Sequence, residues 1–242
     1  LSITTGEANT LLGAFAGDSF TTGNSNTAVG YAALDADTLG DRAVAVGVGA
    51  LGAQNFTSST DNYNIGIGYN AGAVITTGVQ NTIVGGNALL DNQTGGNNVA
   101  VGYTALQNAT SNFNVAVGSV AGRGDSGGFS GDASVFVGYE AGKSLTSGSN
   151  NVFIGYQAAQ SATTASNSVA VGRGALSDIT TGDTNVAVGR SALSSEIQGD
   201  RNVAVGYFAL NAQSNSSDAD VYNTAVGYFA GGVITSGTRN TL

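Results

Sequence analysis

Tyrosine is the residue whose type and spacing in this sequence most clearly suggest chemistry. Seven of the nine tyrosines directly follow a glycine in a short phrase that recurs along the chain. Aromatic rings at a fixed place could stack against a glycan or a host-surface protein. Packing over a turn or between subunits explains the same spacing, and the sequence leaves both readings open. These tyrosines, called the tyrosine row below, are Tyr31, Tyr69, Tyr103, Tyr139, Tyr156, Tyr207 and Tyr228.

Loop insertions are the second place where function is expected. Insertions in a repeat protein form loops on one side, often the functional one. The middle insertion begins with Arg123-Gly124-Asp125, the tripeptide that integrins recognise, although a glycine-rich loop produces such a match easily by chance. The expected insertions lie near 53–63, 123–133 and 212–222.

Loop carboxylates are candidate calcium ligands, because Ca²⁺ binds oxygen donors. Asp125 with Asp132, or Asp218 with Asp220, has suitable chemistry. The calcium-binding nonapeptide Gly-Gly-x-Gly-x-Asp is absent, so we expect solvated carboxylates and assign no metal and no cofactor. The N-glycosylation sequence occurs at Asn55, Asn92, Asn108 and Asn215.

Several function classes are disfavoured by composition. The chain has no Cys and no His, so it lacks disulfides, thiolate metal sites and the most common general base. No serine, lysine or carboxylate pair stands out as an activated catalytic group, and we expect no enzyme activity. The net charge of -9 disfavours nucleic acid, which needs a basic patch. No apolar run is long enough to span a membrane, so no membrane contact is expected within this segment.

The phrase that carries the tyrosines is repeated along the whole sequence, as in Asn98 to Leu106. Eight of the 12 intervals between central glycines are 17 residues, and the others are 21, 16, 20 and 21. A fixed period over the full length predicts a solenoid in which each repeat is one coil. The 13 central glycines, expected to form corners, are Gly13, Gly30, Gly47, Gly68, Gly85, Gly102, Gly118, Gly138, Gly155, Gly172, Gly189, Gly206 and Gly227.

Each copy predicts a strand before this glycine, which we number position zero. Positions −3 and −1 are mostly β-branched, as in Val99 and Val101, and share one strand face. Position −2, mostly alanine, is never polar and lies on the other face. The sequence does not decide which face is the coil interior. After the corner we expect a short second strand near position +7 and a turn at a second glycine near +10.

Asparagine recurs at position −4, just before the strand. Identical amides stacked at the strand spacing can hydrogen-bond from coil to coil. A local preference of asparagine for turns explains the recurrence equally well. The expected ladder comprises Asn26, Asn64, Asn81, Asn98, Asn114, Asn151, Asn185, Asn202 and Asn223.

These patterns predict an all-β fold, a parallel β-solenoid of about 13 coils, mostly of 17 residues, forming one repeat array over residues 1–242. Such a coil buries either the valine or the alanine face, and the other would be a long apolar stripe. We therefore expect self-association of identical stripes in a closed ring. The last three residues, Asn240 to Leu242, begin a fourteenth copy, so we expect a segment of a longer repetitive protein.

The phrase Thr181 to Gly189, Thr-Gly-Asp-Thr-Asn-Val-Ala-Val-Gly, resembles the YadA-like head repeat of trimeric autotransporter adhesins. Similar tandem repeats occur in phage tail-fibre-like proteins. The resemblance covers the whole chain and implies a left-handed β-roll, three chains to a fibre, that binds host surfaces or matrix. The coil here is a few residues longer than the typical head repeat, and no neck, stalk or anchor is visible.

The sequence thus favours an extracellular fibre segment, on a cell or virion surface, that presents repeated surface groups for attachment. The partners expected are further copies of the chain, as a homotrimer or filament, and a host-surface protein or glycan. One alternative is a purely structural filament or phage tail-fibre shaft without a specific ligand. A monomeric ice- or glycan-binding solenoid is a third, although the threonines cluster at turns rather than on a flat face.

Overall fold

The computed structural model of the chain describes residues 5–125, 127–217 and 219–242. The described residues form β-strands and turns without a helix, and hence no helix that could cross a membrane. Contacts divide the chain into two compact units, Leu1–Ala116 and Val117–Leu242. Both units are built from the same coil, and a single array over 1–242 stays a prediction.

In the first unit, three-residue strands pair in parallel with the strands of neighbouring coils. A two-stranded pair, β3 and β5, accompanies them. β9 (Val115–Val117) contains the boundary between the units. The strands of this unit are β1 (Thr10–Leu12), β2 (Thr27–Val29), β3 (Gly40–Asp41), β4 (Val44–Val46), β5 (Thr60–Asp61), β6 (Ile65–Ile67), β7 (Thr82–Val84) and β8 (Val99–Val101).

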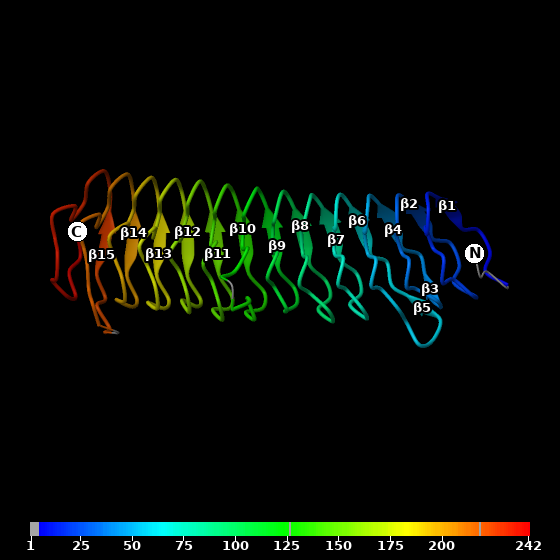
Figure 1. The fold of residues 1–242 in the computed structure, drawn as a ribbon. Coiled ribbons are helices and arrows are strands. Elements are labelled where there is room, and N and C mark those ends of the chain that lie inside the picture. Colours follow the sequence, from blue (N-terminus) through cyan, green and yellow to red (C-terminus); the bar gives the residue numbers. More distant parts are fainter. Residues whose placement is uncertain (1–4, 126, 218) are drawn as a thin grey trace. The chain divides into compact units, whose positions relative to one another are not determined.

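The second unit repeats this arrangement. Figure 1 shows its strands, coloured green to red, stacked so that every strand is followed by a turn and a return segment. The register places equivalent positions of neighbouring coils opposite one another, as in Val186↔Val203 and Ala187↔Ala204. The predicted parallel β-solenoid of about 13 coils is therefore confirmed. The strands are β10 (Val135–Val137), β11 (Val152–Ile154), β12 (Val169–Val171), β13 (Val186–Val188), β14 (Val203–Val205) and β15 (Thr224–Val226).

The alanine face is the coil interior. At position −2, Ala100 and Ala187 are fully buried, whereas the flanking valines at −3 and −1 point outward and remain partly accessible. The alanine at +3 and the apolar residue near +7 close the interior from the opposite side, as Ala105 and Ile75 do. We call the outward positions −3 and −1 the valine face.

The prediction of a second strand after the corner is wrong. A chain of turns replaces it, because residues at +2 and +4 are left-handed in all 13 coils, as Thr104 (φ 53°) and Leu106 (φ 50°) illustrate. The N–H at +2 donates to the preceding coil, as Thr104 does to the Gly86 carbonyl (3.0 Å). The N–H at +4 donates to the following coil, as Leu89 does to the Ala105 carbonyl (2.9 Å). The pattern of polar and apolar residues does not reveal that right-handed and left-handed backbone conformations alternate in this segment.

Glycine is needed at the corner for two reasons. Gly172 has a φ of 135°, which L side chains rarely adopt. A Cβ added there would also lie 2.5 Å from the carbonyl oxygen of Gly189 in the next coil. The corners therefore stack backbone directly on backbone.

Polar side chains form a second column inside the coil. Asn98 and Asn114 at position −4 are fully buried. The Asn81 side-chain oxygen accepts the Asn98 N–H (3.0 Å), and the Asn98 oxygen accepts the Asn114 N–H (2.9 Å). Where serine replaces asparagine, its hydroxyl accepts instead, as Ser168 does from the Asn185 N–H (3.1 Å). The asparagines thus form a ladder of side chain to backbone bonds, in which each residue satisfies the donor of the next coil.

One step of this ladder is supplied from a different position. Ala43 occupies position −4 in its coil, and the Asn64 N–H instead donates to the side-chain oxygen of Asn62 (2.9 Å). In the equivalent coils of the second unit, asparagine stands at 202 and valine at 221, and Asn223 N–H donates to the Asn202 oxygen (3.2 Å). In the first unit the acceptor is the asparagine at 62, with alanine at 43, and in the second unit it is the asparagine at 202, with valine at 221. Either arrangement gives the N–H of the next residue at −4 an asparagine oxygen as its acceptor.

We expect Gly172→Ala to destabilise the fold by about 1–3 kcal/mol from backbone strain alone, with the contact to Gly189 adding to this loss. Urea unfolding measures the effect. Gly127→Ala is the matched control, because an added Cβ meets no atom within 4 Å there. Equal stability of the two variants would show that the corner is not constrained.

We also expect Asn62→Val to cost about 1–3 kcal/mol, because it leaves the buried Asn64 N–H without an acceptor. Adding Ala43→Asn recreates the pair found at 202 and 221 and should recover most of the loss. A double-mutant cycle in urea unfolding measures the coupling. Additive effects of the two substitutions on stability would contradict the inference that an asparagine at position 43 can replace Asn62 as the acceptor.

Candidate functional surface

No ligand-sized cavity is found in the part of the chain that the structure describes, and the candidate groups are surface side chains. The seven tyrosines of the row are all exposed, from 36% for Tyr207 to 79% for Tyr228. Each follows the corner glycine, where the chain leaves the strand. In each unit the tyrosines of the row therefore lie just beyond the carboxyl ends of the strands, beside the valine face.

Neighbouring rings of the row stack on one another. The ring centroids of Tyr139 and Tyr156 lie 5.4 Å apart with an interplanar angle of 20°. Those of Tyr207 and Tyr228 lie 5.4 Å apart at 5°. Each of these four rings therefore uses one of its faces within the row.

Two arginines complete the row in the second unit. Arg173 and Arg190 stand at the same position +1 and are exposed. The row there reads Tyr139, Tyr156, Arg173, Arg190, Tyr207 and Tyr228 from coil to coil. The tyrosines alone were singled out from the sequence, although aligning the copies on position +1 shows the arginines too.

A carboxylate modifies the first tyrosine of this group. A hydrogen bond with Glu140, together with its negative charge, raises the pKa of Tyr139 above 10.0. A hydrogen bond from Gln157 (3.0 Å) is the largest of the influences that lower the pKa of Glu140, and Lys143 lies 3.2 Å away. The Glu140 charge is therefore already engaged within the chain.

The insertions contribute to the coil interior as well as to the surface. Phe129, from the expected loop at 123–133, is fully buried, and its ring centroid lies 5.7 Å from that of Phe136. In the integrin-type tripeptide, Gly124 is buried while Arg123 and Asp125 are half-buried. The tripeptide is therefore not presented as an exposed loop tip.

The other expected loop ligands are also constrained. The described residues contain no group of three acidic side chains able to hold a metal ion, and Asp218 lies outside the described residues. Of the glycosylation sequences, Asn55 is exposed, whereas the Asn92 side chain is fully buried and accepts the Gly95 N–H (2.7 Å).

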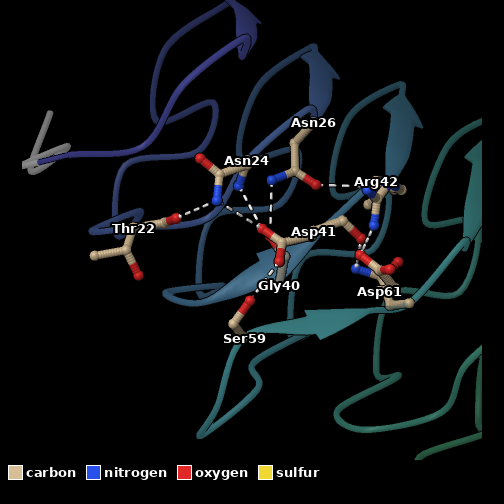
Figure 2. Close-up of polar contacts among 10 residues, drawn as sticks. Thr22, Asn24, Asn26, Gly40, Asp41, Arg42, Ser59 and Asp61 are labelled. Carbon is tan, nitrogen blue, oxygen red and sulfur yellow. Dashed lines mark hydrogen bonds and ion pairs between the residues drawn. The ribbon is translucent and has the colours of Figure 1, made fainter.

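Charged side chains fasten the long insertion of the first unit (Figure 2). The Asp41 carboxylate accepts hydrogen bonds from the Asn24 N–H and the Ser59 hydroxyl, both at 2.6 Å, and so joins three passes of the chain. Arg42 forms an ion pair with Asp61. These groups are satisfied within the protein, which favours a structural role.

The second unit contains an equivalent ion pair. Arg201 forms an ion pair with Asp220, and the Tyr222 hydroxyl donates to Asp220 (3.0 Å). The Arg201 guanidinium also lies over the Tyr222 ring, 5.7 Å from the ring centroid. In the first unit the Arg42 guanidinium lies over the Tyr63 ring in the same way, 5.8 Å from the ring centroid. Positions 42, 61 and 63 are related to 201, 220 and 222 by one constant offset in the sequence. The tyrosines outside the row thus belong to the insertions.

A buried carboxylate lies beneath each of these insertions. The Gln54 side-chain amide donates to Asp37 (2.6 Å) and its oxygen accepts from Asn64 (2.8 Å). In the second unit, Gln213 donates to Glu196 (2.6 Å) and accepts from Asn223 (2.7 Å). Burial raises the pKa of Asp37 above 3.8, and its hydrogen bonds to Gln54 and to the backbone oppose that shift only in part.

Comparison of the chain with family models, curated proteins and solved structures finds no match. The geometry above is therefore the basis for assigning a function.

Stability should depend on pH through Asp37. Because its folded-state pKa is raised, its contribution is complete below about pH 4 and is lost as the pH rises through the folded-state pKa. Relative to Asp37→Asn, the wild-type protein should therefore lose stability as the pH increases from about 3 to about 7. Urea midpoints of both proteins measure the trend, and a relative gain of the wild type with pH would contradict it.

Proposed function

We propose that this chain is a segment of an extracellular fibre, in which copies associate through the valine face and the tyrosine row presents repeated groups for attachment. The observation that carries the proposal is the outward direction of the valines. The interior is already filled by alanine, asparagine and the residues near +7. The valine face is therefore left for contacts outside the chain.

The extent of this face supports association. In both units the outward positions of neighbouring strands pair in register, as Val169↔Val186 and Val171↔Val188 do. Several of them are substantially exposed in the single chain, including Ile65 and Ile67 in the first unit and Val226 in the second. A continuous apolar stripe of this kind is larger than a soluble monomer normally exposes. Identical stripes meeting around an axis bury it in a closed ring.

The oligomer that we propose is a homotrimer, which is what the resemblance to YadA-like head repeats implies. Attachment is multivalent: weak contacts at equivalent positions of successive coils and of several chains add as avidity. The targets are a cell surface, a matrix or neighbouring fibres. This assigns the valine face to assembly and the tyrosine row to attachment.

We expect light scattering of the 242-residue chain to give about three times the monomer mass of 23.8 kDa. Val171→Lys with Val205→Lys places two charges on the valine face without touching the interior, and should yield folded monomer. Circular dichroism checks the fold. A monomeric wild type would refute association, and a large polymer would favour the structural filament instead.

Val169→Thr with Val203→Thr is the matched control. Threonine occupies the same outward position −3 natively in β2, β7 and β15, so the coil tolerates it. This variant should remain a trimer. Dissociation of the control to monomer would show that loss of fit, rather than charge, breaks the assembly.

A further inference from the structure

We propose that the tyrosine row of the second unit binds a linear acidic polysaccharide, whose carboxylate or sulfate groups are held by Arg173 and Arg190. This inference rests on the attachment role proposed above and names its ligand class. The arginines supply the charge complementarity, and the tyrosines beside them supply the contacts to sugar rings and hydroxyls.

The two arginines stand apart from the other basic residues of the chain. Only 7 basic residues accompany 16 acidic ones. Arg42, Lys143 and Arg201 each form an ion pair with a carboxylate. Within the described residues no ion pair is found for Arg123, Arg173, Arg190 or Arg239, and of these four only Arg173 and Arg190 stand at position +1. They are also placed on adjacent coils at the same position, where like charges repel and destabilise the stack. A bound anion would remove that repulsion.

The surroundings of these side chains orient them for an anion. The Arg173 guanidinium lies over the Tyr156 ring, 5.7 Å from its centroid, and Arg190 lies over Tyr207 at 5.4 Å. Arg190 also donates to the Tyr207 hydroxyl (3.3 Å). These contacts hold both guanidinium groups beside the tyrosine rings, and guanidinium N–H groups bind a carboxylate or sulfate in bidentate fashion.

A polysaccharide fits this row better than other acidic polymers do. Nucleic-acid bases stack on free ring faces, but the Tyr156 ring lies between Tyr139 and Arg173, and the Tyr207 ring lies between Arg190 and Tyr228. An extended peptide binds best at a free strand edge, whereas β10 to β15 pair successively with one another. Ring edges and hydroxyls, repeated about every 4.8 Å along the stack, match sugar hydroxyls along a linear glycan.

The test measures binding of the whole chain, in its own oligomeric state, by isothermal titration calorimetry. The probes are polygalacturonate, which carries carboxylates, and dextran sulfate, with neutral dextran and polyglutamate for comparison. We expect salt-sensitive binding of polygalacturonate or dextran sulfate, and their comparison identifies the preferred anionic group. Arg173→Gln with Arg190→Gln should weaken it at least about tenfold, because charge-assisted hydrogen bonds are lost.

Two control variants, each with a pair of substitutions, test whether binding depends on this site or only on net charge and aromatic content. Arg42→Gln with Arg239→Gln removes the same charge outside the row and should change affinity much less. Tyr156→Ala with Tyr207→Ala should weaken binding, whereas Tyr31→Ala with Tyr103→Ala, in the first unit, should not. Circular dichroism verifies that each variant is folded.

The proposal is overturned if neither acidic polysaccharide binds, if the protein with Arg173→Gln and Arg190→Gln binds as tightly as the wild type, or if polyglutamate binds as tightly as the glycans. Light scattering of the same samples keeps the two proposals apart. A monomer that binds acidic polysaccharide through the arginines would overturn the assembly alone. A trimer that binds no glycan would overturn the ligand alone.

Discussion

Coil-to-coil hydrogen bonding of the backbone is the constraint on which the rest of this structure depends. Some backbone groups pair within a coil, as the Ala105 N–H does with the Gly102 carbonyl (3.3 Å), but most are satisfied by the coils before and after it. Equivalent positions must then lie directly over one another, which allows no room for a Cβ at the corner. Glycine at the corner, alanine inside the strand and an amide at −4 are consequences of that stacking.

The repeat made much of this fold predictable. The period, the strand before each glycine and the corner at Gly172 and its equivalents all follow from patterns of residue size and branching. The choice between the two strand faces did not follow, because valine and alanine are both apolar. In the structure, position −2 faces the interior whether it is alanine, as in most coils, or a larger residue such as Phe136 or Phe153, and the amides at −4 complete that interior.

Two further features were not predicted from the sequence. The return segment was expected to contain a strand, because Ile75 and its equivalents are apolar, but left-handed residues such as Thr104 have no characteristic side chain that marks them. The arginines of the row were missed for a simpler reason. Arg173 and Arg190 hold the same position +1 as the tyrosines but are a different residue type, and position rather than type defines a surface row in a solenoid.

The left-handed residues at +2 and +4 also bear on how such a chain acquires its structure. In an isolated coil these conformations are strained, and the hydrogen bonds that offset the strain come from the neighbouring coils. A coil is therefore stable only on a template, and the template it offers to the next coil is the same as the one it received. A chain that emerges gradually from one end, during synthesis or export, can accordingly fold by successive addition, with each finished coil serving as the surface on which the following one is ordered.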